Sequence, residues 1–233
     1  MGRGEFGVRR NVGRSGDYAF CWRGQSRGIR SDWTAVDPSK TYELSGYFKA
    51  KSGVFTGVTF GVIMADAQQR VMQHVNVFSL KGTRTELAAP CRAGERILLL
   101  KDASGWKPGT GFMAAFGVGE NELTFNVTPR GINEVSPAGD HWRMVLSNPC
   151  RLDLPAGTPV VENRSGNNGI YLYGFTEIQG EWTELKGTIG PQQWWPGTAY
   201  ARVVVIGPGL RIQRRGADAK TLLMDDFALR MLK

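Results

Sequence analysis

The stretch VDPSKTYELSGYFKAKSG, from Val36 to Gly53, contains the clearest structural signal in the chain. It opens with Asp-Pro-Ser-Lys, a combination typical of a turn. After the turn, residues of two kinds alternate, as on the two faces of a strand. One face carries Tyr42, Leu44, Gly46, Phe48 and Ala50, and the other carries Glu43, Ser45, Tyr47 and Lys49. The alternation predicts a strand with one buried face and one polar face that includes an aromatic ring.

The rest of the 233-residue chain extends this pattern. Its 31 glycines and 11 prolines divide it into short segments, which favours strands and turns over helices. A hydrophobic content of 41% is sufficient for a core. The segment from Thr56 to Phe78 allows either a short helix or a hairpin, and we favour a hairpin that turns at Asp66 to Gln69. We therefore predict an all-β protein.

Four segments in order suggest a family. They are YELSGYFKA, the Trp-led EWTELKGTIG, GTAYARVVV and the closing DDFALRML. Together they resemble a jelly-roll carbohydrate-binding module of the family 4/9-like, galactose-binding-like kind, over residues 15–62 and 180–233. The resemblance implies a β-sandwich that binds glycans on one sheet.

The middle of the chain departs from that module. TELAAPCRAGERILLLKDASGW, from Thr85 to Trp106, resembles a hairpin found in bacteriophage tail-fibre, tailspike and other virion proteins. We therefore predict a jelly-roll β-sandwich formed by 17–79 and 176–233, a small β-rich subdomain inserted at 80–175, and an extended N-terminal arm at 1–16.

The two resemblances imply a non-enzymatic virion component: a fibre, spike or capsid-decorating protein used for assembly and for binding host glycans. Its expected partners are other virion proteins and further copies of itself, for example as a trimer. Two alternatives stay open. One is an accessory module or small enzyme acting on bacterial polysaccharide, and the other is an assembly protein that has lost sugar binding.

Charge and hydropathy bear on whether the protein binds nucleic acid, enters a membrane or carries a signal peptide. The net charge is +8, but the arginines occur in ones and twos without a DNA- or RNA-binding motif, so we expect no nucleic-acid partner. No apolar run approaches the ~18 residues of a membrane span, so we expect no membrane insertion. The first 16 residues contain no apolar segment, so we expect no signal peptide and release by host lysis.

Aromatic and charged side chains are the candidates for sugar binding. Aromatic rings stack on the apolar C–H faces of sugars, while polar neighbours bond the hydroxyls. Tyr47 lies between Glu43 and Lys49 on the polar face, and Trp194 and Trp195 occupy a loop bounded by proline and glycine. For each of the three rings, burial in a core or against a neighbouring subunit is the alternative. No pair of carboxylates is marked out as catalytic, so we predict no enzymatic activity.

The metal and cysteine candidates complete the list. The resemblance implies that Asp225 and Asp226 help to bind a structural calcium ion, which needs six to eight oxygens; no other cofactor is expected. Cys91 and Cys150 each lie in a Leu-x-x-Pro-Cys-Arg stretch. If these stretches are neighbours, the two thiols could form a disulfide or a cross-link between chains, and the alternative is two inert buried thiols.

Overall fold

A computed structural model describes residues 5–23, 28–51, 53–207 and 221–233. The chain divides into two compact units, a first unit of residues 1–70 and 169–233 and a second unit of residues 71–168. Among the described residues, no helix is long and apolar enough to span a membrane.

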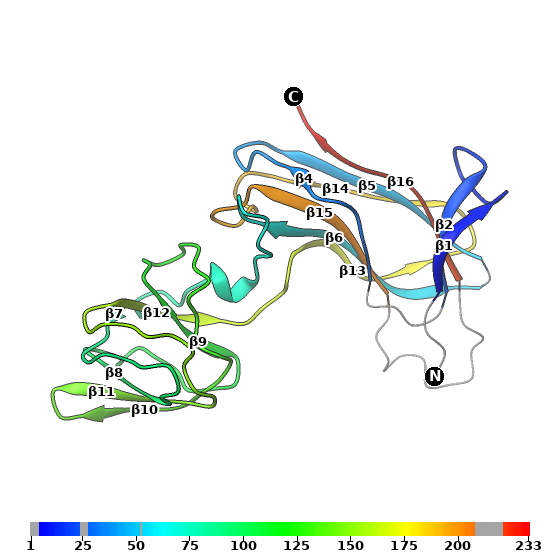
Figure 1. The fold of residues 1–233 in the computed structure, drawn as a ribbon. Helices are drawn as coiled ribbons and strands as arrows, with labels where there is room; N and C mark the ends of the chain where they lie inside the picture. The colour runs from blue at the N-terminus through cyan, green and yellow to red at the C-terminus, as the bar shows by residue number, and fades with distance from the viewer. Residues whose placement is uncertain (1–4, 24–27, 52, 208–220) are drawn as a thin grey trace. The chain divides into compact units, whose positions relative to one another are not determined.

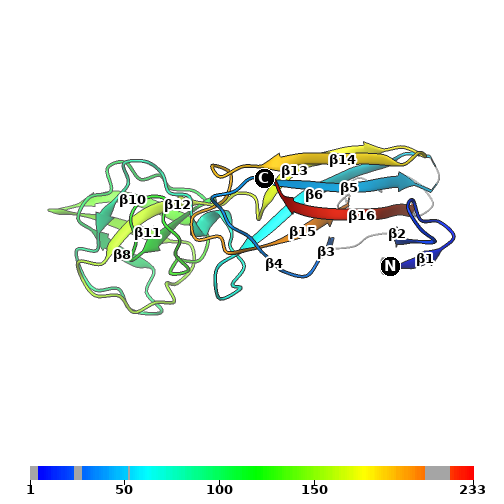
Figure 2. The same cartoon turned by 90° about the horizontal axis from the view of Figure 1, so that it is seen from above.

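The first unit is a sandwich of two antiparallel sheets, which Figure 1 shows as two layers and Figure 2 shows from above, with one sheet lying over the other. The β5 sheet has the order β1 (Glu5–Arg10), β2 (Tyr18–Arg23), β16 (Thr221–Met231), β5 (Tyr42–Ala50) and β14 (Thr183–Ile189). The β6 sheet consists of β13 (Ile170–Ile178), β6 (Phe55–Ala65), β15 (Tyr200–Ile206), β3 (Ile29–Arg30) and β4 (Thr34–Ala35), the last two both paired with β15. The prediction of an all-β jelly-roll sandwich is confirmed.

Strand β5 has the alternation that its sequence predicts. Its even-numbered residues are buried and its odd-numbered residues are only partly buried along the whole strand. Phe48 faces the core and meets Phe60 of β6, with ring centroids 5.1 Å apart. Each fully buried side chain of this size contributes about 1.5–3 kcal/mol, so contacts between the two inner faces hold the sheets together.

A bulge in β16 explains the glycine in the middle of β5. Pairing with β5 is regular up to Asp225 and resumes at Ala228, and Asp226 between them has a φ of 51°. The bulge places the Phe227 ring against Phe48 and over Gly46, where an added Cβ would lie 2.4 Å from the Phe227 ring. Only glycine leaves room for this ring.

The second unit is built from two three-stranded antiparallel sheets and one short helix. The first sheet contains β10 (Ile132–Ala138), β11 (His141–Leu146) and β8 (Ile97–Leu100). The other contains β7 (Thr85–Glu86), β12 (Pro159–Arg164) and β9 (Phe112–Phe116), and η1 is a 3-10 turn at His74–Asn76. Leu98, Leu100, Phe116 and Met144 are buried in a core of its own.

Several boundaries differ from those predicted. The second unit covers 71–168, whereas the predicted insertion was 80–175. Residues 5–10 of the predicted arm form β1, which pairs with β2 along its whole length. The chain does turn at Asp66 to Gln69, but the hairpin is wrong: β6 pairs with β13 and β15, and the residues after Arg70 belong to the second unit.

Candidate functional site

The outer face of the β5 sheet contains a polar groove of about 410 Å³. Strands β5, β14 and β16 supply most of its walls, and the β1–β2 turn adds Arg14. The lining residues are Arg14, Glu43, Ser45, Tyr47, Glu184, Lys186, Asp226, Phe227 and Arg230. Because side chains alternate along a strand, the groove lies on the solvent side of the same strands whose other side chains build the core.

Two ion pairs lie in the groove. Lys186 Nζ lies 2.7 Å from Glu43 Oε2, and this hydrogen bond raises the pKa of Lys186. Arg14 Nη1 lies 2.8 Å from Asp226 Oδ2. Hydrogen bonds from Ser15 and then Arg14 lower the pKa of Asp226. The groove therefore presents fixed cations and anions side by side at neutral pH.

Tyr47 lies at the centre of the groove. It is opposite Glu184 of β14 on one side and Asp225 of β16 on the other. The Arg14 guanidinium carbon lies 3.5 Å from the ring centroid, so a cation–π contact covers one face of the ring. Glu43 lines the same groove, as predicted from the strand pattern. Lys49 shares the outer face of β5 but is not part of the lining.

The prediction that Trp194 and Trp195 could stack on a sugar is wrong. Each side chain is only 6% exposed. The Trp194 indole donates to the Lys40 carbonyl at 3.3 Å and meets Tyr42 edge-on at 5.6 Å. Proline and glycine around the pair suggested an open loop, but the loop folds inward because two indoles bury a large apolar area.

Asp225 and Asp226 do not fit the calcium hypothesis. Asp225 Oδ2 accepts the Arg14 backbone N–H at 2.8 Å, and Asp226 accepts both the Ser15 hydroxyl and the Arg14 guanidinium. In the part of the chain that the structure describes, no three Asp, Glu, His or Cys side chains gather. An arginine therefore neutralises Asp226, and among the described residues no third acidic side chain joins the pair as a calcium ligand.

The two Pro-Cys-Arg stretches are neighbours in the second unit. The Cys91 N–H donates to the Leu154 carbonyl at 2.9 Å, and the Gly94 N–H donates to the Cys150 carbonyl at 2.8 Å. Both thiols are buried, free and directed at the Leu152 carbonyl, at 3.8 Å for Cys91 and 3.7 Å for Cys150. Burial, and then the contact with Cys150, raises the pKa of Cys91 to about 12. A disulfide between them stays a prediction.

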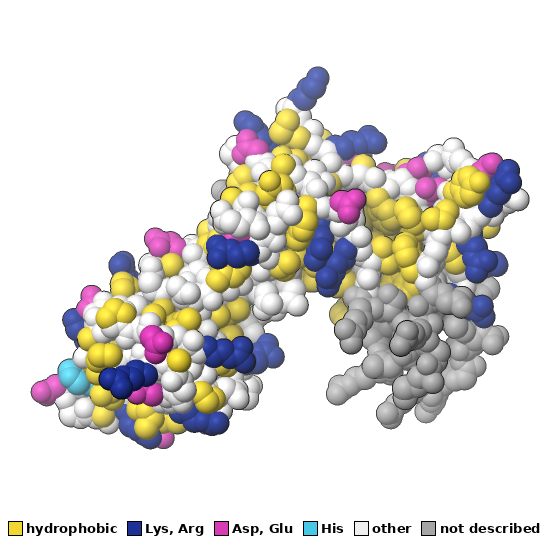
Figure 3. Space-filling model, in the orientation of Figure 1, with side chains coloured by type: hydrophobic (Ala, Val, Ile, Leu, Met, Phe, Trp, Pro, Cys, Tyr) yellow, Lys and Arg dark blue, Asp and Glu magenta, His cyan; other side chains and the backbone are white. Residues whose placement is uncertain are grey.

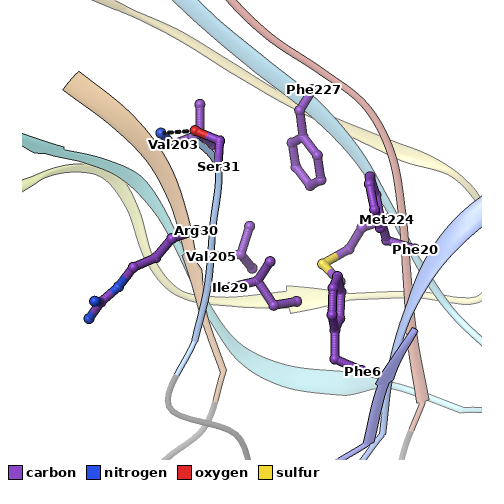
Figure 4. A pocket seen from close by; sticks show the side chains of 9 residues that line it. All are labelled: Phe6, Phe20, Ile29, Arg30, Ser31, Val203, Val205, Met224 and Phe227. Atoms are coloured by element: carbon purple, nitrogen blue, oxygen red, sulfur yellow. Dashed lines mark hydrogen bonds between the residues drawn. The ribbon is translucent and has the colours of Figure 1, made fainter. Parts of the chain in front are cut away.

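A second concavity in the first unit is apolar. This slot of about 240 Å³ is lined by Phe6, Phe20, Ile29, Arg30, Ser31, Val203, Val205, Met224 and Phe227. Phe6 and Phe20 stack with ring centroids 5.7 Å apart. Figure 4 shows the apolar side chains pointing into the slot and Arg30 pointing away from it. The slot therefore offers few groups that could bond sugar hydroxyls.

Comparison with known proteins leaves the family of the chain open. No family model matches the sequence, and no curated protein matches it. The CBM22-1 xylan-binding domain of Xyn10C from Paenibacillus barcinonensis superposes with a TM-score of 0.39 at 10% identity. The superposition covers 100% of this chain and 84% of that chain, but the TM-score is too low to establish a common fold.

Proposed function

We propose that the first unit is a glycan-binding module whose site is the groove on the outer face of the β5 sheet. One observation carries the proposal. The groove gathers a tyrosine ring and at least four hydrogen-bonding side chains, Glu43, Ser45, Glu184 and Lys186, on neighbouring strands. Ring faces bind the C–H surface of a sugar, and charged groups form strong hydrogen bonds to its hydroxyls.

We also propose that the module is not an enzyme. Glycosidases place two carboxyl groups about 5–9.5 Å apart across the bond they cleave. Glu43 and Glu184 are separated by four residues along the strand, because Glu184 pairs with Tyr47. That separation is about 14 Å at 3.4 Å per residue. Asp226 is unsuited to act as a general acid, because its neighbours lower its pKa.

The biological setting is a further part of the proposal. The resemblance of Thr85–Trp106 to a virion hairpin supports a structural or attachment protein of a bacteriophage particle, released by host lysis. Its partners would be other virion proteins and further copies of this chain. Mass spectrometry of purified particles tests this setting: the chain should be present in stoichiometric amounts, and its absence from particles would overturn the virion assignment.

A glycan array with point variants tests the binding function. The wild-type chain should bind at least one glycan, and Tyr47→Ala should abolish that binding. Tyr18→Ala is the matched control, because Tyr18 is a half-exposed tyrosine on β2 that does not line the groove. Tyr47→Phe separates the ring from its hydroxyl. Wild-type binding that survives in Tyr47→Ala, or the absence of any glycan ligand, would reject the site.

Incubation with bacterial polysaccharides tests the proposal that the module is not catalytic. The wild-type chain should release no reducing ends. Release that disappears in Glu43→Gln or Glu184→Gln would show an enzyme instead, and the alternative of a small polysaccharide-degrading enzyme would then hold.

A further inference from the structure

The outer face of the β6 sheet has a different chemistry from the groove. Tyr171 of β13, Gly61 of β6, Val204 of β15 and Arg30 of β3 lie in one row across the four strands. Arg202 is two residues from Val204 on β15 and so lies on the same face. Arg30 and Arg202 are therefore diagonal neighbours, with backbones about 7–8 Å apart. Figure 4 shows the Arg30 side chain leaving β3 on the side opposite the apolar slot.

Aromatic rings accompany the two arginines. The guanidinium carbon of Arg202 lies 4.3 Å from the centre of the Trp33 ring. This stacking holds the guanidinium in place, because a guanidinium is weakly hydrated and loses little hydration energy when it lies over an indole. The Tyr171 phenol is close enough to Arg30 for the arginine charge to act on its pKa, although burial is the larger effect and raises it. We call Arg30, Trp33, Tyr171 and Arg202 the arginine face.

Among the residues that the structure describes, the two cations of the arginine face have no compensating acid. Among the described residues, the ion pairs include neither Arg30 nor Arg202. The buried Nε of Arg202 has no hydrogen-bond partner among the described residues. Burial and the charge of Arg30 lower the pKa of Arg202, so the two guanidinium groups oppose each other. In the groove, by contrast, Lys186 and Arg14 each bind a carboxylate.

We propose that the arginine face is a second binding site, which recognises the carboxylate or sulfate groups of an acidic polysaccharide. Arginine binds such groups through two parallel N–H···O bonds, and an anion would relieve the repulsion between the two guanidiniums. The Tyr171 hydroxyl can donate a further hydrogen bond. The site is separate from the groove, so it does not depend on the function proposed there.

A nucleic acid is the other polyanion to consider, and the distribution of charge favours the glycan. Phosphate backbones are bound by several cations spaced along a strand. On the face drawn in Figure 3, Lys and Arg side chains lie in small separate groups with Asp and Glu among them. A pair of arginines beside two rings matches isolated acidic groups better than a continuous phosphate backbone.

Calorimetry of the full chain with defined polymers tests the proposal. The probes are polygalacturonate for carboxylates, heparin for sulfates, dextran as a neutral polymer, and single-stranded DNA. We expect binding of polygalacturonate or heparin that weakens with added salt, and no binding of dextran. Tighter binding of DNA than of both acidic polysaccharides would overturn the proposal, as would the absence of binding to either polysaccharide.

Point variants locate the binding on the arginine face. Arg30→Gln should weaken binding about tenfold or more, since a hydrogen bond to a charged group is lost. Arg92→Gln is the matched control, because it removes the same charge from an exposed position in the second unit and should leave binding unchanged. Arg202→Lys keeps the charge while removing the planar fork, and it too should weaken binding.

The groove variant separates this proposal from the previous one. Tyr47→Ala should leave binding of the acidic polymer unchanged, whether or not the groove binds a glycan. If Tyr47→Ala abolishes that binding while Arg30→Gln preserves it, the arginine face is not the site. Circular dichroism of each variant confirms that the chain has folded before titration.

Discussion

Glu162 on β12 is a carboxylic acid with no exposed surface, and its ionisation offers a direct test of the second unit. Oε1 accepts the Lys107 backbone N–H at 2.9 Å, while Oε2 is buried without a hydrogen-bond partner among the described residues. Burial raises the pKa of Glu162 from 4.5 to about 7, and the bond from Lys107 opposes the rise only in part. The folded chain therefore holds this proton over a pH range in which the unfolded chain releases it.

The sign of the effect follows from proton linkage. A raised pKa in the folded state contributes stability that is complete below pH 4.5 and is lost as the pH rises through about 7. The interval between these two pKa values corresponds to about 3 kcal/mol of unfolding free energy. Wild-type chain should therefore be less stable at pH 8 than at pH 5 by up to this amount from Glu162 alone.

The variant Glu162→Gln isolates that contribution, because its amide has the shape of the protonated acid and does not ionise. Urea unfolding of both chains, followed by circular dichroism, gives the difference in unfolding free energy at each pH. The difference should shift in favour of the variant by about 3 kcal/mol between pH 4.5 and pH 8. Titrations common to both chains cancel.

Glu134→Gln is the control within the same unit. Hydrogen bonds from Ser136 and the charge of Arg143 lower the pKa of Glu134, so its titration lies below the range tested. Its difference curve should be flat between pH 5 and pH 8. A flat curve for Glu162→Gln as well, or a difference that shifts in favour of wild type as the pH rises, would refute the assignment of a buried, proton-holding carboxyl group.

Three further predictions concern packing and the thiols. Gly46→Ala should lower the unfolding free energy by about 1–3 kcal/mol, because the new methyl group meets the Phe227 ring. Thermal unfolding measures the change in stability, and unchanged stability would contradict the bulge geometry. Trp194→Ala should cost about 3–5 kcal/mol in the same assay while leaving glycan affinity of the remaining folded protein unchanged. Native chain should expose one reactive thiol, Cys21, to a thiol reagent at pH 8, because Cys91 and Cys150 are buried and the pKa of Cys91 is about 12. In denaturant, three thiols of a fully reduced chain should react, but only one of a chain in which Cys91 and Cys150 form a disulfide. Rapid reaction of three thiols in the native chain would contradict the packing.

Within a single strand, the sequence predicted which residues are buried and which face outward. The alternation of Tyr42 to Ala50 assigned Leu44 and Phe48 to the core, and Glu43 and Tyr47 to the outer face. Side chains on a strand point to opposite sides in turn, so this assignment needs no partner strand. The order of short strands and turns likewise indicated an all-β fold before any pairing was known.

Local reasoning failed where burial depends on distant residues. The sequence around Trp194 and Trp195 is typical of an exposed loop, yet both indoles are buried. Trp194 packs on Tyr42 and donates a hydrogen bond to Lys40, both about 150 residues earlier in the chain. The acidic pair at Asp225 resembles a calcium ligand, yet Arg14 and Ser15 from the opposite end of the chain bind both side chains.

The sequence by itself thus determined the class of fold and the face on which each residue of β5 lies, because the two-residue period of a strand is local. Only the tertiary structure decided which outer-face residues become neighbours. Register between strands brings Glu184 beside Tyr47 and Arg30 beside Val204. Such pairings are set by long-range packing, and the groove and the arginine face exist only after the sheets have formed.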